Sequence, residues 1–149
     1  MKNKLKLIQE RISSETVTVA NNIIKSTDAF MSGFSKDDIF SFSSTDKKEN
    51  YAEKYFLFIS SISPMLSRLN ALNAELAALL IKSDKAMETE ITLLCEKRFN
   101  AFEKFERALC EYTFAIESEL SKNAISVVFI LNSTQKLKES LNQLIKENR

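Results

Sequence analysis

The residues of this sequence that could do acid–base, nucleophilic or metal chemistry are few. There is no histidine, which excludes a Ser–His or Cys–His nucleophile pair, an imidazole acid or base, and a histidine metal ligand. The two cysteines are too few for a zinc site of four thiolates, and no mixed cysteine–histidine site can form. The single glycine excludes a P-loop and a dinucleotide-binding glycine fingerprint. We therefore expect no catalytic residue, no bound metal and no cofactor.

Glutamates between residues 88 and 119 are the remaining candidates for catalysis. Two carboxylates in one cleft could serve glycoside hydrolysis. Most of these glutamates are interleaved with lysines and arginines, for example Glu103 with Arg107 at i,i+4, which is typical of a solvent-exposed helix face. Acids and bases are also evenly mixed, with a net charge of only +1, so we expect no nucleic-acid partner.

Arg98 is the charged residue that interrupts an apolar stripe. If the chain reverses near residue 84, Arg98 lies opposite Asn70, with Asn73 one turn away, and Glu15 could supply a counter-charge. A buried guanidinium needs such partners. The sequence leaves two interpretations open: a buried polar layer of these four residues, or an arginine whose stem packs while its head reaches water.

Long helices must position these residues. A sheet protein of 149 residues needs many turns, and turns need glycine or proline, of which the chain has one each. Apolar residues make up 44% and charged residues 28%, which is typical of one folded domain. We therefore predict an all-α protein with a single domain over residues 1–149.

Apolar residues recurring at steps of three, four and seven predict four helices. They cover about residues 2–31, 50–83, 85–120 and 124–147, with a long loop at 33–49. Pro64 lies inside the second, which we expect to continue with a kink; the alternative is a break with Ser63 as N-cap.

Residues 121–123 decide the architecture. If they form a turn, which we favour because asparagine tolerates the backbone that ends helices, the fold is an antiparallel up-down four-helix bundle with long helices. If the helix continues from 85 to 147, the fold is a helical hairpin packed on one very long C-terminal helix that forms a dimeric coiled coil.

The run AISVVFIL at 124–131 is apolar on every side. It is too short to cross a membrane, and we expect no second strand to pair with it, so we interpret it as helix buried against a partner. The predicted partner interface is Val127, Val128, Phe129, Ile130 and Leu131. The long loop adds Phe34, Phe40 and Phe42, either as a plug over the bundle end or as docking residues, with a short extra helix at 36–41 compatible with both.

For function, the sequence indicates a non-enzymatic helical protein–protein interaction module, a small subunit or adaptor of a larger assembly. The alternative is a toxin-neutralising immunity protein or a secretion chaperone that binds one specific partner. We expect a protein partner or self-association as a homo-oligomer. No secretory signal and no stretch of about 20 apolar residues is present, so we expect a cytoplasmic protein without a transmembrane segment.

Overall fold

Four helices and two short strands make up the described part of the chain. In the computed structural model the helices are α1 (Lys2–Met31), α2 (Thr45–Lys82), α3 (Lys85–Leu120) and α4 (Val127–Glu147). The strands are β1 (Ile39–Ser41) and β2 (Ala124–Ser126). The structure describes residues 2–32, 39–41, 45–82, 85–122 and 124–149.

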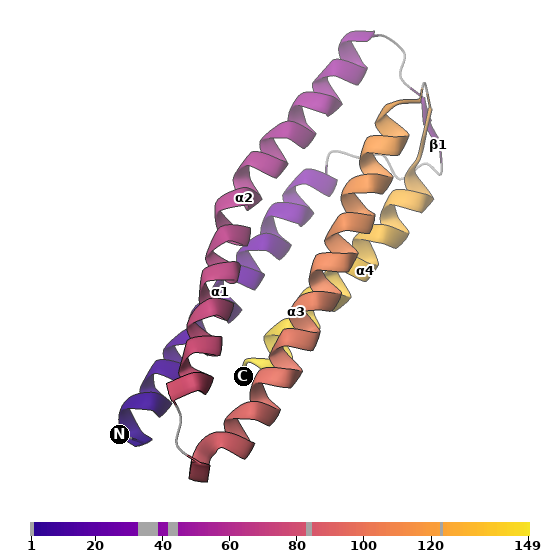
Figure 1. The fold of residues 1–149 in the computed structure, drawn as a ribbon. Coiled ribbons are helices and arrows are strands. Elements are labelled where there is room, and N and C mark those ends of the chain that lie inside the picture. The colour runs from indigo at the N-terminus through magenta and orange to yellow at the C-terminus, as the bar shows by residue number, and fades with distance from the viewer. Residues whose placement is uncertain (1, 33–38, 42–44, 83–84, 123) are drawn as a thin grey trace.

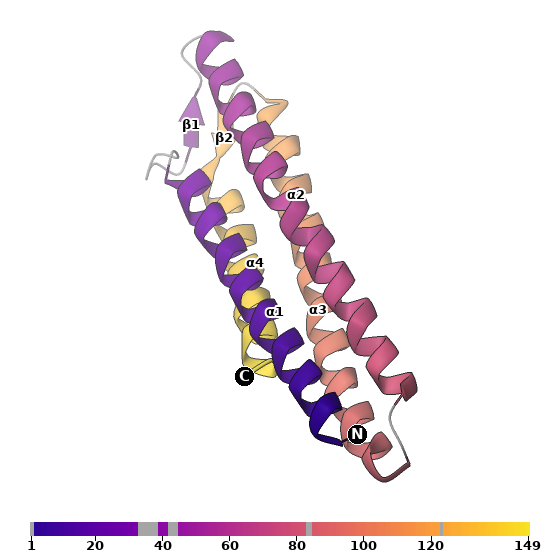
Figure 2. The ribbon, with the colours of Figure 1, turned by 90° about the vertical axis from the view of Figure 1, so that its left-hand side faces the viewer.

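The helices form an elongated four-helix bundle in which each helix runs opposite to the next (Figure 1). The most extensive packing lies within two hairpins, α1 with α2 and α3 with α4; α4 against α1 and α2 against α3 close the ring (Figure 2). The predicted turn after Leu120 is therefore confirmed. The alternative of one continuous helix over residues 85–147 is wrong.

Helix α2 is continuous through Pro64, so the alternative of a break with Ser63 as N-cap is wrong. Ser63 instead donates its hydroxyl to the Ile59 carbonyl, at 2.8 Å, one turn before the proline. The helix begins at Thr45 rather than near Asn50. The added residues, TDKKE, contain neither glycine nor proline, and lysine and glutamate are good helix formers.

The strand pair corrects two sequence predictions. β1 and β2 pair in antiparallel register, with Phe40 opposite Ile125. The start of AISVVFIL is therefore a strand, although the sequence predicts no partner strand for it. Residues 39–41 are also a strand, where the sequence is compatible with a short helix. The physical reason is that a strand of three residues takes all its stability from a partner that local sequence does not reveal.

The core has two parts. The larger is made by all four helices; its members with the least exposed side chains include Ile23, Phe105, Tyr112, Ile116 and Leu137. The smaller, which contains no residue of α4, lies between α1, α2 and α3 and consists of Leu5, Ile12, Leu72, Leu76, Leu79 and Cys95. Helix α4 has 21 residues and the other helices 30 or more, so one end of the bundle has three helices. In the described residues no helix combines the length and hydropathy needed to cross a membrane.

Candidate functional site

The strand pair joins the two segments that the sequence predicts as an interface. Phe40 belongs to the first connection and Ile125 to AISVVFIL, yet their backbones are neighbours in the β1–β2 register. We call the end of the bundle where β1 and β2 pair and α4 begins the strand end (Figure 1). The side chain of Phe40 lies outside the described residues, as do Phe34 and Phe42 entirely, so their part in an interface stays a prediction.

A buried carboxylate fixes the start of α4. Glu119, in the last turn of α3, is only 4% exposed. Its carboxylate accepts a hydrogen bond from the Ser126 backbone N–H at 3.0 Å and forms an ion pair with the Lys122 ammonium at 3.1 Å. Ser126 is the N-cap of α4, and its hydroxyl accepts from the Phe129 N–H at 3.4 Å. The strand end is therefore held by named polar contacts as well as by packing.

These contacts set which side chains of AISVVFIL face outward. Val127 and Ile130 are each 1% exposed and pack in the bundle itself, so their assignment to a partner interface is wrong. Val128 is 44% exposed, and Phe129 and Leu131 are each 48% exposed. The helical period is the reason: residues 127, 130 and 134 share the inner side of α4, and the residues between them do not.

Exposed large apolar side chains gather toward the strand end. The described residues include nine exposed large apolar side chains, and six of these lie within about four turns of a helix terminus at the strand end. They are Phe56, Leu57, Phe114, Val128, Phe129 and Leu131. The remaining three lie near the opposite end: Leu7, Ile81 and Leu93. Single exposed apolar residues need no explanation, but a group of them is typical of an interaction surface.

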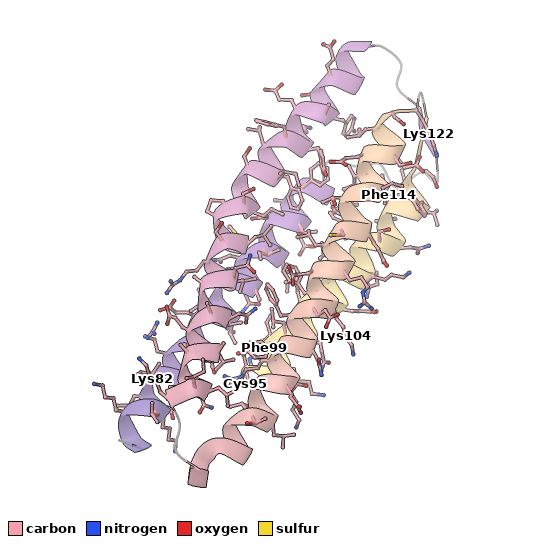
Figure 3. All side chains as sticks on the ribbon, in the orientation of Figure 1. Lys82, Cys95, Phe99, Lys104, Phe114 and Lys122 are labelled. Atoms are coloured by element: carbon pink, nitrogen blue, oxygen red, sulfur yellow. The ribbon has the colours of Figure 1, made fainter. Side chains whose placement is uncertain are left out.

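Phe114 and Phe129 lie on the same side of the α3–α4 hairpin. Arg107 of α3 and Lys136 of α4 line one shallow groove between these helices. Phe114 follows Arg107 by seven residues and Phe129 precedes Lys136 by seven, a spacing that returns a helix to the same side. Figure 3 shows Phe114 in the part of α3 that leads to Lys122 and the strand end. The two phenylalanines therefore lie on the side of the hairpin that carries this groove, about two turns from Arg107 and Lys136.

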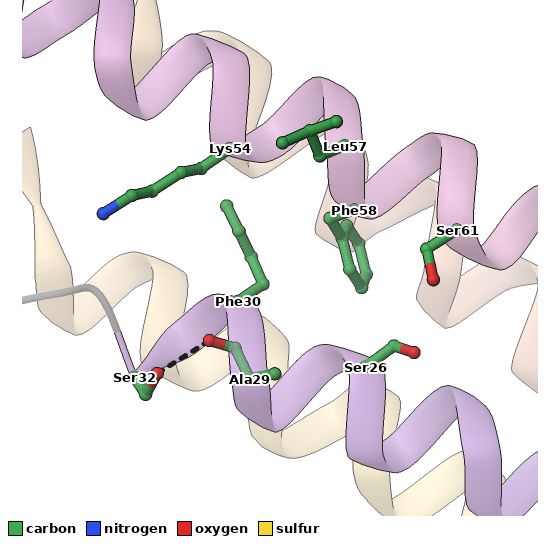
Figure 4. A pocket seen from close by; sticks show the side chains of 8 residues that line it. All are labelled: Ser26, Ala29, Phe30, Ser32, Lys54, Leu57, Phe58 and Ser61. Carbon is green, nitrogen blue, oxygen red and sulfur yellow. Dashed lines mark hydrogen bonds between the residues drawn. The ribbon is translucent and has the colours of Figure 1, made fainter.

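A hollow of about 410 Å³ lies between α1 and α2 (Figure 4). Phe30 and Phe58 form its apolar wall, with their rings stacked at a centroid distance of 5.1 Å. Small side chains leave the space open; these are Ser26, Ala29, Ser32 and Ser61. Leu57, which is exposed, and Lys54 complete the lining. An apolar wall with one ammonium group suits an apolar side chain that lies next to an acidic group.

The predicted polar layer around Arg98 is not formed as expected. Arg98 is buried, which the apolar stripe predicts, and its Nε donates to the Glu147 carbonyl at 3.2 Å. Asn70 is exposed and Asn73 half-buried. The expectation that Asn70 belongs to a buried layer is therefore wrong. The alternative of an Arg98 head that extends into bulk water is also wrong, since Arg98 is 5% exposed and its remaining access is through a hollow that it lines. The partner of Arg98 is the C-terminal end of α4, whose carbonyls carry the negative end of the helix dipole.

Glu15 instead belongs to an exposed ion-pair network between α1 and α2. Its carboxylate pairs with Arg68 of α2 and with Arg11, at 3.2 Å, on its own helix. Glu75 completes the network by pairing with both arginines. The Arg68 guanidinium holds the pKa of Glu15 below its usual value. The network connects the two helices of the first hairpin, and the counter-charge predicted for Arg98 is used there.

Few titratable groups have the surroundings of a catalytic residue. Burial raises the pKa of the Cys95 thiol and of the Tyr112 phenol, which keeps both protonated at neutral pH. Cys110 is exposed. No group of three or more Asp, Glu or Cys side chains in the described part of the chain is placed to hold a metal ion.

Sequence reasoning missed Glu119 and the hollow between α1 and α2. Glu119 lies in the segment whose glutamates the sequence mostly assigns to the solvent face. It nevertheless follows Tyr112 and Ile116 in the phase of the core stripe, and that phase identifies it as buried. The hollow results from small residues that face each other across α1 and α2. Predicting it requires the register of one helix against the other, which the sequence does not give. No family model, curated protein or solved structure matches this chain.

Proposed function

We propose that this protein is a non-enzymatic helical protein–protein interaction module, a small subunit or adaptor of a larger assembly. The observation that carries the proposal is the group of exposed phenylalanine and aliphatic side chains at the strand end, above all Phe114 and Phe129 on one side of the α3–α4 hairpin. Interfaces concentrate their binding energy in a few buried aromatic residues. The absence of histidine supports the non-enzymatic part.

The partner on this surface is a protein segment that presents apolar side chains, because the exposed residues of the surface are apolar and its flanks mix both charges. Arg107, Glu111, Lys136 and Glu139 line the groove on the side of the hairpin where Phe114 and Phe129 lie. Such a mixed polar rim around an apolar centre is typical of protein interfaces. It contrasts with the one-sided basic surface that nucleic acids need.

The test is a pair of charge substitutions, Phe114→Glu and Phe129→Glu, compared with Leu7→Glu and Leu93→Glu. All four residues are exposed, so all four variants should fold. Self-association is measured by sedimentation velocity. A hetero-partner is captured from the native cell, purified and titrated against each variant. We expect the two phenylalanine variants to weaken the association at least about tenfold, because burying a charge in an apolar interface costs more than 1.4 kcal/mol.

Two results would overturn the proposal. One is a wild type that is monomeric and whose purified partners, if any, bind the phenylalanine variants as tightly as they bind the wild type. The other is loss of binding in the Leu7 and Leu93 variants with the phenylalanine variants unaffected, which would place the interface at the opposite end. Loss of self-association would identify a homo-oligomer, and loss of one defined partner would identify an adaptor or a protective binder.

A further inference from the structure

A polar hollow of about 420 Å³ lies where α4 ends, between α1 and α3. It is lined by Arg98 of α3, by Asn148 and Arg149 after α4, and by one face of α1: Gln9, Glu10, Ser13, Ser14, Val17 and Thr18. In both views the C-terminal end of α4 lies short of the bundle end that carries the N-terminus (Figures 1 and 2). The shorter fourth helix therefore leaves this space open.

Arg98 lines this hollow, and its charge has few partners. Its side chain is 5% exposed, and because it lines the hollow, the hollow is where Arg98 can be reached. Its Nε donates to the Glu147 carbonyl. Its Nη1 is buried and, among the described residues, has no hydrogen-bond partner. Among the described residues, Arg98 has one backbone acceptor and no ion pair, and the Glu147 carboxylate acts on it only from beyond ion-pair distance. A buried guanidinium with these partners lacks much of the compensation that burial requires.

The surroundings of Arg98 favour an anion with oxygen acceptors. Arg149 adds a second guanidinium at the exposed rim. Ser13 and Thr18 already donate their hydroxyl protons to carbonyls of α1, at 2.9 and 3.1 Å, and the two arginines are the cationic donors of the lining. Glu10 is the acidic side chain of the lining, and it directs an anion away from α1 and toward Arg98 and Arg149.

We propose that this hollow binds a small oxyanion, the carboxylate or phosphate group of a ligand, with Arg98 and Arg149 as its counter-charges. A planar guanidinium can donate two parallel hydrogen bonds to either group. The site lies at the other end of α4 from the strand end, and it goes beyond the proposed function. Loss of anion binding can therefore be measured separately from loss of partner binding at the strand end.

The test is an NMR titration of ¹⁵N-labelled full-length protein with sodium phosphate or sodium acetate, at an ionic strength kept constant with sodium chloride. We expect saturable shifts of the Arg98 Nε–H and of the Ser14 and Asn148 amides. Saturation with phosphate alone identifies a phosphate group, saturation with acetate alone identifies a carboxylate, and saturation with both identifies a general oxyanion site. Absence of saturable shifts with either anion overturns the proposal.

Matched variants separate the site from general charge effects. Arg98→Lys keeps the charge but removes the planar fork, and we expect the dissociation constant to rise about tenfold or more, since a hydrogen bond to a charged group contributes at least that much. Arg149→Gln, at an exposed position, should also weaken binding, whereas Glu10→Gln should tighten it, a gain that a disturbed fold cannot produce. Arg107→Gln is the control, an exposed arginine paired with Glu103 at 3.3 Å. Equal weakening by the control and by Arg149→Gln, or no change in Arg98→Lys, overturns the proposal.

Discussion

Two buried tyrosines show how differently one side chain can be accommodated in this core. The Tyr55 hydroxyl donates to the Glu117 carboxylate at 3.1 Å and so connects α2 with α3. The Tyr112 hydroxyl is buried and has no partner within hydrogen-bond distance in the described residues. Thr134 lies close to it, but the Thr134 hydroxyl donates to the Ile130 carbonyl at 2.8 Å. Tyr112 therefore contributes through its ring, which packs edge-on against Phe58 at a centroid distance of 6.1 Å.

Tyr112→Phe should leave the free energy of unfolding at pH 7 within about 1 kcal/mol of the wild type, or increase it, because it removes a buried hydroxyl that has no partner. Tyr55→Phe should cost about 1 kcal/mol, the usual contribution of one hydrogen bond. Urea denaturation of both variants provides the measurement. A cost of more than about 2 kcal/mol for Tyr112→Phe would show instead that this hydroxyl is hydrogen-bonded in the folded protein.

The same substitution should change the alkaline stability. Burial raises the pKa of Tyr112 in the folded state above the ordinary value of 10.0. Below that pH both states are protonated; above it the unfolded chain releases the proton while the folded chain retains it, so stability falls as pH rises. Denaturation at about pH 9 and about pH 11 should show a shallower loss in Tyr112→Phe than in the wild type. An unchanged slope would contradict burial of this phenol.

At the scale of elements, the turn from α3 to α4 depends on Glu119. Its carboxylate holds the Ser126 N–H, and Ser126 in turn caps α4. Glu119→Ala should lower the free energy of unfolding by about 1–3 kcal/mol, the cost of a buried donor left unpaired. Faster amide exchange at the start of α4 is the local sign. Glu106→Ala, at an exposed position of the same helix, should have little effect, and equal effects of the two changes would mean that the contact contributes nothing.

The elements also show what the sequence can predict. Apolar periodicity places the ends of α1 and α3 and the reversal after Leu120, because each helix buries one stripe and that stripe is local information. It also places Arg98 correctly in the core. It cannot identify the partner of Arg98, since that partner is a backbone carbonyl and every residue has one. Periodicity cannot predict the β1–β2 pair for a similar reason. Each strand has only three residues and is stabilised by pairing with the other, not by its own local sequence.

The whole molecule combines a four-helix core with a three-helix end. The smaller core around Leu76 lacks any residue of α4, whereas Leu141, fully buried, belongs to the larger core shared by all four helices. Fewer packed neighbours mean a lower free energy for local opening. The three-helix end should therefore open before the rest of the bundle.

Leu76→Ala and Leu141→Ala test this difference. Each should cost about 2–5 kcal/mol, the usual range for leucine truncation in a core. In native-state hydrogen exchange, Leu76→Ala should reduce protection mainly in α1 near Ile12 and in the C-terminal half of α2. Leu141→Ala should reduce it throughout the bundle. Loss of protection everywhere in both variants would show that the two cores unfold as one cooperative unit.

The β1–β2 pair has a consequence for the order in which parts of the chain fold. Ile39 and Ser126 are paired although 87 positions separate them, and closing so long a loop costs entropy that ordering of the intervening chain reduces. The strands come together when α2 and α3 have formed their antiparallel pair and brought residues 39–41 and 124–126 to the same end of the bundle. The apolar surface beside them is therefore complete only when residues 124–131 have joined the bundle. A chain still being synthesised, or one truncated before Ser126, would not display it, so a partner that docks there would distinguish finished molecules from unfinished ones.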